Sequence, residues 1–206
     1  GIFVRLAAMC RLFASVAPGP RPVYDVLVDA EFSLLRQADA DPKNPQKDGW
    51  GLAWFDASGA ARVTKSGRPA PEERARFCAA ADAAGASKVV LGHIRAASNP
   101  HQDDEEYAHP FSDEGWVFAH NGTLTISKEV AAALGARRAR LKTDGDSEIY
   151  FQQFLKHLAV SRDPSIAFES CIKENWFLWD SCKSRYPGAA TPSWPGDTST
   201  RRSTSK

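Results

Sequence analysis

The chain contains little cysteine and methionine and no long apolar run. Four of its 206 residues are cysteine and one is methionine. The cysteines show neither C-x-x-C spacing nor clustering with histidine, so we expect no metal site and no disulfide framework; they are Cys10, Cys78, Cys171 and Cys182. No stretch approaches the roughly 20 apolar residues that span a bilayer. The sequence therefore predicts no membrane span and, with no secretion signal, a cytoplasmic protein.

Charge is also balanced, with a formal net value of +1. This balance gives no reason to expect nucleic acid or an anionic membrane surface as a partner. The sequence is 43% hydrophobic and 25% charged, which is typical of a globular protein. At 206 residues it is long enough for one domain with a sizeable core.

Three regions differ in character. Residues 1–9 are too short for a signal peptide, and we interpret them as a leader or upstream remnant. Residues 10–175 hold the periodic, apolar segments of a folded domain. Residues 176–206 are rich in Ser, Thr, Pro and Arg, and we expect a divergent, disordered tail because so polar a segment buries too little apolar surface.

Within the folded region, strands and helices do not alternate strictly, which favours an α+β fold. Apolar alternation predicts strands at 11–16, 88–94 and 116–120 and a hairpin within 49–66. Apolar residues at three- and four-residue spacing predict helices at 23–38, 71–85, 127–135, 146–160 and 163–175.

The stretch "MCRLFASV" at residues 9–16 places a cysteine directly after the methionine. If translation starts at Met9, removal of that methionine leaves Cys10 as the first residue, with a thiol and a free amine. The amine titrates near neutral pH, so it can serve as the base for its own thiol. The alternative is that Cys10 is a small buried hydrophobe at the start of a strand.

Three further stretches place polar residues at the ends of apolar segments. Arg95 in "GHIRAAS" can bind a carboxylate with two donors, or form a structural ion pair. Asn121 and Gly122 in "FAHNGTL" can bind an oxyanion, or form a turn. Asp146 in "TDGDSE" can hold an ammonium group, or cap a helix. Together these groups match the needs of γ-glutamyl amide hydrolysis: a nucleophile, an oxyanion hole, and binders for a carboxylate and an ammonium.

In their order, Met-Cys-Arg-Leu, "DGWGLAW", "GHIRAAS", "HPF", "FAHNGTL" and "DSE" resemble the class II glutamine amidotransferases, which are N-terminal nucleophile hydrolases. The stand-alone branch beginning Met-Cys-Arg is the most similar, and the resemblance covers about residues 9–160. It implies a four-layer αββα sandwich. Family members usually continue with further strands after the last helix, so we expect a C-terminally truncated sandwich here.

The resemblance also implies roles for single residues. Cys10 is the expected nucleophile, with Asn121 and Gly122 as the oxyanion hole. No cofactor is implied, and the substrate is glutamine or another γ-glutamyl amide or peptide. A separate acceptor-domain subunit that receives the ammonia is a further possible partner.

Four residues are expected to bind the substrate. Arg95 resembles the arginine that binds the α-carboxylate, and Ser98 lies in the same loop. Asp146 resembles the aspartate that binds the α-ammonium, although Asp144 in the same stretch competes for that role. His109 in "HPF" matches a family histidine that contacts the substrate or only holds its loop.

Two alternatives remain open. With residues 1–9 attached, Cys10 has an amide nitrogen and lacks the proposed base. The chain is then an inactive, truncated γ-glutamyl-binding or regulatory remnant. The second alternative, which tolerates a blocked Cys10 amine, is a cysteine hydrolase that uses His93, His109 or His120 as a separate base.

Overall fold

A computed structural model of the chain describes residues 10–85, 87–97 and 104–187. Two antiparallel sheets and two groups of helices make up these residues, which confirms the α+β class. The strands are β1 (Arg11–Val16), β2 (Trp50–Phe55), β3 (Ala61–Ser66), β4 (Val89–Ile94), β5 (Phe111–Asp113) and β6 (Trp116–Phe118). The α-helices are α1 (Arg74–Ala84), α2 (Ser127–Ala133), α3 (Asp146–Ser161) and α4 (Pro164–Cys182). Five short helical segments are η1 (Asp25–Asp29), η2 (Arg36–Ala38), η3 (Glu105–Tyr107), η4 (Gly135–Arg140) and η5 (Lys183–Arg185).

The larger sheet has the strand order β1-β4-β2-β3. Both β1 and β2 run antiparallel to β4, and Arg11 and Trp50 both lie opposite Ile94. The residues just before β1, just before β2 and just after β4 therefore meet at one end of the sheet. This end carries the pocket described below.

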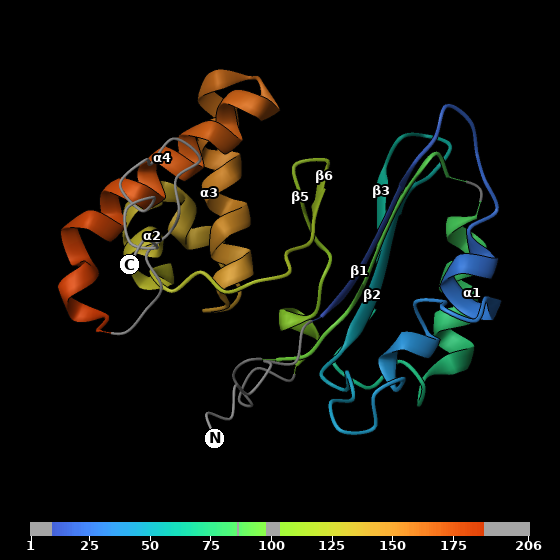
Figure 1. The fold of residues 1–206 in the computed structure, drawn as a ribbon. Coiled ribbons are helices and arrows are strands. Elements are labelled where there is room, and N and C mark those ends of the chain that lie inside the picture. Colours follow the sequence, from blue (N-terminus) through green and yellow to red (C-terminus); the bar gives the residue numbers. More distant parts are fainter. Residues whose placement is uncertain (1–9, 86, 98–103, 188–206) are drawn as a thin grey trace, which may run out of the picture.

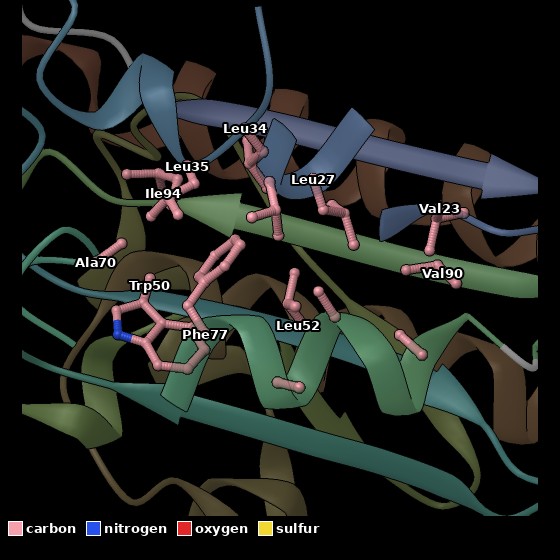
Figure 2. Close-up of a cluster of buried hydrophobic side chains, with 14 of the residues drawn as sticks. Val23, Leu27, Leu34, Leu35, Trp50, Leu52, Ala70, Phe77, Val90 and Ile94 are labelled. Carbon is pink, nitrogen blue, oxygen red and sulfur yellow. The ribbon is translucent and has the colours of Figure 1, made fainter. Parts of the chain in front are cut away.

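One face of the larger sheet is covered by η1, η2 and α1 (Figure 1). Their apolar side chains interdigitate with those of β2 and β4, as Figure 2 shows for Leu27, Leu52 and Phe77. On the other side, the short β5–β6 hairpin lies between the sheet and the helices α2, α3 and α4 (Figure 1). Phe111 of β5 packs there with Phe151 and Phe154 of α3. Burial of these two apolar clusters stabilises the strands and helices that position the residues of the pocket.

The predicted helix at 23–38 is wrong. The chain forms only the short segments η1 and η2 there, because it turns at Ala30, whose ψ of 151° is extended. The Ser33 hydroxyl, which is fully buried, donates to the Val28 carbonyl and stabilises this turn. Apolar residues on both sides of the turn still reach the core, which explains the helix-like spacing; they are Leu27, Val28, Leu34 and Leu35.

The last helix continues past the predicted start of the tail at residue 176. α4 extends to Cys182, and the short segment η5 follows. Trp179 and Cys182 pack with Ile126 and Val130, so residues in this stretch join a core cluster instead of forming part of a disordered tail. Residues 188–206, the rest of that predicted tail, lie outside the described residues, as does the predicted leader at 1–9. No described helix is both long and apolar enough to cross a bilayer.

Candidate active site

A pocket lies at the end of the larger sheet and is formed by segments far apart in the sequence. Cys10 comes from the start of β1 and Arg95 from the end of β4. The 107–111 segment, the loop after β6 and the first residues of α3 complete the walls. The other lining residues are Ala96, Ala97, Tyr107, His109, Phe111, His120, Gly122, Gly145, Asp146 and Ser147.

The Cys10 thiol is half-buried beside the loop that follows β4. The Ala96 N–H donates to Cys10 Sγ at 3.3 Å, and Sγ lies 3.4 Å from the Ala96 carbonyl oxygen. Burial raises the pKa of the Cys10 thiol, while the Ala96 hydrogen bond and the Arg95 guanidinium oppose that rise. A raised pKa favours the protonated thiol, so a base would be needed for the Cys10 sulfur to act as a nucleophile.

The loop after β6 is hydrogen-bonded to the backbone of Cys10. Asn121 Nδ2 donates to the Cys10 carbonyl oxygen at 3.1 Å, and Gly122 lines the pocket beside the His120 ring. Of the two residues predicted to form an oxyanion hole, Asn121 contacts Cys10 and Gly122 lines the same pocket as Cys10. In this structure the Asn121 side-chain N–H donates its hydrogen bond to the Cys10 backbone carbonyl.

Asp146 is the first residue of α3, and its carboxylate links the start of that helix to the segment after β6. Its Oδ2 accepts a hydrogen bond from Leu124 N at 2.6 Å, and its Oδ1 accepts one from the Ser147 hydroxyl at 3.3 Å. The N-cap residue of α3 is Gly145, so Asp146 does not occupy the capping position that the alternative required. Asp144 is exposed and accepts a hydrogen bond from the Tyr107 hydroxyl. Of the two aspartates, Asp146 is the one that lines the pocket.

Arg95 and His109 are both largely buried in the pocket wall, at 6% and 5% exposure. The Arg95 guanidinium lies 5.9 Å from the Tyr107 ring centre, and its Nη1 donates to the Asp48 carbonyl at 3.3 Å. Neither ring nitrogen of His109 has a hydrogen-bond partner among the described residues. Burial holds the pKa of His109 well below its ordinary value, with the neighbouring His93 acting in the same direction. Ser98 lies outside the described residues.

Comparison with known proteins identifies the fold's relatives. The family model described as "Glutamine amidotransferases class-II" matches residues 9–175. The chain belongs to the class II glutamine amidotransferases. This is a family of enzymes, as the order of the motifs predicts.

Two relatives give more detail about this class II amidotransferase. It is 29% identical over 157 residues to the gamma-glutamyl-hercynylcysteine sulfoxide hydrolase of Mycolicibacterium smegmatis, a match that covers 74% of this chain and 67% of the relative. It also resembles the solved structure of a glutamine aminotransferase class-II domain protein from Silicibacter pomeroyi, with a TM-score of 0.52 and 25% identity. That match covers 65% of this chain and 58%, less than two thirds, of the solved one.

Sequence reasoning missed Asp48 and Tyr107, which lie in or beside the candidate pocket. Asp48 contacts the loop after β4, and Tyr107 lies in the pocket wall. A signal for Asp48 was present: an acidic residue precedes one predicted strand and Arg95 follows another, and antiparallel pairing brings those two positions to one end of a sheet. Trp50, from the same motif as Asp48, is fully buried against Phe77 and donates to Glu73, so its role is structural.

A second, larger cavity of about 560 Å³ lies between β3, β5 and α3. Among the described lining residues it shares only Phe111 with the candidate pocket, and none of Cys10, Arg95 and Asp146 lines it. The sequence-predicted site residues Cys10, Arg95, Gly122 and Asp146 thus line the smaller pocket. No group of three or more His, Cys, Asp or Glu in the described ranges is arranged to hold a metal ion.

Proposed function

We propose that the chain hydrolyses a γ-glutamyl amide, with Cys10 as the nucleophile. The observation that carries this proposal is the pocket itself. Cys10, Arg95, Gly122 and Asp146 come from four separate segments and line one pocket. The family supports amide chemistry, and the γ-glutamyl substrate named for the mycobacterial relative supports the substrate class.

The charged groups of the pocket suit the α-amino acid end of a glutamyl group. Arg95 is the donor for the α-carboxylate, since a guanidinium can offer two parallel hydrogen bonds. Asp146 is the acceptor for the α-ammonium. His109 lines the same pocket, with its ring packed on that of His93 and with unpartnered ring nitrogens, and we place it against the glutamyl chain.

In the first step, Cys10 Sγ attacks the side-chain carbonyl carbon and the carbonyl oxygen becomes an oxyanion. Gly122 N–H and the Asn121 amide are the proposed oxyanion donors, once the Asn121 side chain exchanges the Cys10 carbonyl for the substrate. The tetrahedral intermediate expels the amine, which takes up a proton, and a thioester remains. Water then attacks the thioester, releases glutamate and restores the thiol.

The proposed base is the α-amine of Cys10. Burial raises the pKa of the thiol, so a proton acceptor is needed, and a free α-amine has a pKa near neutral. In the printed sequence Cys10 is preceded by nine residues and its nitrogen is an amide. The mechanism therefore requires a start at Met9 with loss of that methionine, or cleavage before Cys10.

The test compares the chain as printed with a version that starts at Met9, using glutamine and γ-glutamyl p-nitroanilide as substrates. Intact mass shows whether Cys10 is terminal, and released glutamate reports activity. We expect release only from the version with a terminal cysteine, and loss of release in Cys10→Ala. Cys78→Ala is the matched control, because Cys78 is a half-buried cysteine of α1 that does not line the pocket.

Other outcomes select the alternatives. Activity with residues 1–9 still attached contradicts the α-amine as base and favours a histidine base. A folded protein with a terminal cysteine and no release favours a γ-glutamyl-binding remnant. Ammonia production that depends on a second protein favours an acceptor subunit.

Two finer expectations belong to the same proposal. The β5–β6 hairpin is the second sheet of the family's four-layer sandwich, since it lies between the larger sheet and the α2–α4 helices (Figure 1). The cytoplasm is the proposed location, because all four cysteines are free and reduced thiols are typical of that compartment.

A further inference from the structure

Asp48 lies two residues before β2, at the end of the sheet that carries the pocket. It makes three hydrogen bonds to the 95–97 loop. Asp48 N–H donates to the Arg95 carbonyl at 3.2 Å, and Arg95 Nη1 donates to the Asp48 carbonyl at 3.3 Å. The Ala97 N–H donates to Asp48 Oδ2 at 2.8 Å, so the side chain holds the far end of the same loop.

This loop carries two groups of the candidate site. One is the Arg95 guanidinium, and the other is the Ala96 N–H that donates to Cys10 Sγ. Ala96 lies between the two residues that Asp48 holds. A shift of the loop would therefore move the donor away from the sulfur and the guanidinium away from the pocket together.

We infer that Asp48 is a positioning residue that holds the 95–97 loop against Cys10 and contributes negative charge beside its thiol. The Arg95 part of this inference rests on the proposed function, whereas the Cys10 part does not. The carboxylate has two separable properties. An oxygen accepts the Ala97 N–H, and the charge acts on Cys10 and Arg95.

The charge around the thiol comes from several elements. Arg95 favours the thiolate and Asp48 disfavours it, in addition to the larger effect of burial on the pKa of Cys10. Four other titratable side chains line the pocket; they are Tyr107, His109, His120 and Asp146. Removing only the Asp48 charge should therefore lower the pKa of the Cys10 thiol, whereas an aspartate that merely shapes the strand end would leave it unchanged.

The variants Asp48→Asn and Asp48→Ala separate the two properties. Asparagine keeps an oxygen for the Ala97 N–H and loses the charge, while alanine loses both. The exposed Asp39, which precedes β2 in the same connection and does not line the pocket, provides matched controls as Asp39→Asn and Asp39→Ala. Circular dichroism checks folding, and if Asp48→Ala does not fold, Asp48→Asn carries the test.

The first readout is the rate of Cys10 alkylation by iodoacetamide against pH, resolved by mass spectrometry in the full chain. Cys78 in the same digest serves as the internal reference. We expect Asp48→Asn to move the Cys10 midpoint to lower pH and the Asp39 variants to leave it in place. An unchanged midpoint in Asp48→Asn overturns the inference.

The second readout is kcat/KM for γ-glutamyl p-nitroanilide, measured on the version with a terminal Cys10. Loss of alignment in Asp48→Ala should lower kcat/KM by about tenfold or more, and Asp48→Asn should retain most of it at its own pH optimum. Equal losses in the two variants, or none in Asp48→Ala, overturn the positioning role. If the wild-type protein hydrolyses no γ-glutamyl amide, the proposed function fails, and the alkylation midpoint still decides the role of Asp48.

Discussion

The carboxylate of Asp146 has two separable tasks, and two substitutions can test them. In the structure it accepts the Leu124 N–H at 2.6 Å and so anchors the loop of Asn121 and Gly122. In the proposed mechanism it also binds the substrate α-ammonium. Asp146→Asn keeps an oxygen for the Leu124 N–H but loses the charge, whereas Asp146→Ala loses both.

The expected magnitudes follow from these contacts. An unpaired, partly buried N–H costs about 1–3 kcal/mol, which corresponds to roughly 5- to 150-fold in the population of the correct loop. Loss of the charged partner of a buried ammonium costs about 2–5 kcal/mol, so we expect at least about a 30-fold loss of kcat/KM in Asp146→Asn. The loss in Asp146→Ala should be larger by the loop contribution.

The assay uses two anilides, γ-glutamyl p-nitroanilide and glutaryl p-nitroanilide, which lacks the α-ammonium. With the glutaryl compound, Asp146→Asn should match the wild type, because no ammonium is left to bind. Asp146→Ala should still be slower, because the loop is no longer anchored. Asp144→Asn is the matched comparison and should leave both anilides nearly unaffected.

Two results would refute this reasoning. If Asp146→Asn slows both anilides equally, the carboxylate does not act through the ammonium. If Asp146→Ala is no slower than Asp146→Asn on the glutaryl compound, the bond to Leu124 does not position the loop.

Three further predictions concern stability, measured as urea unfolding. A Cβ on Gly51 would collide with the His109 carbonyl, so Gly51→Ala should lower the free energy of unfolding by about 1–3 kcal/mol, whereas Gly19→Ala, which has nothing within 4 Å, should not. Burial lowers the pKa of His93 to about 4, so below its unfolded pKa of about 6.5 the unfolded state binds a proton that the native state does not. His93 should thus contribute about 2 kcal/mol to the loss of stability from pH 7 to pH 5, in addition to the contribution of His109, and an equally steep fall in His93→Gln would contradict this origin. Asp163 accepts two backbone N–H groups of α4, so Asp163→Ala should cost about 1 kcal/mol, and an unchanged midpoint would exclude the cap.

Much of the fold could be predicted from local patterns. The strands β1, β2, β3 and β4 follow from apolar runs and a turn, and α4 begins at the predicted Asp-Pro pair. The structure of residues 23–38 could not be predicted. The apolar residues there have helical spacing, but they belong to two short helical segments separated by a turn that the buried Ser33 stabilises. The extent of α4 was also missed, because Trp179 and Cys182 find their apolar partners on α2 and its preceding loop.

The candidate site, like the fold, could be predicted from the sequence only in part. Cys10, Arg95, Gly122 and Asp146 were predicted from residue type, position at strand ends and motif order, and they line one pocket. The choice between Asp146 and Asp144 needed the structure, since both stand in one short stretch and only their contacts distinguish them. Asp48 was missed because its role consists of hydrogen bonds to a loop 47 and 49 residues away in the sequence.

The sequence by itself determined which chemical groups are available and in what order along the chain. Thiol, guanidinium, amide and carboxylate are properties of residue types, and their motif order sufficed to place the chain in its family. Only the tertiary structure decided which of these groups meet and what surrounds them. The antiparallel register of β1, β2 and β4 places Cys10, Asp48 and Arg95 at one end of the sheet. Burial there raises the pKa of the thiol and lowers that of the neighbouring histidines, because the cost of desolvating a charge depends on packing and not on residue type.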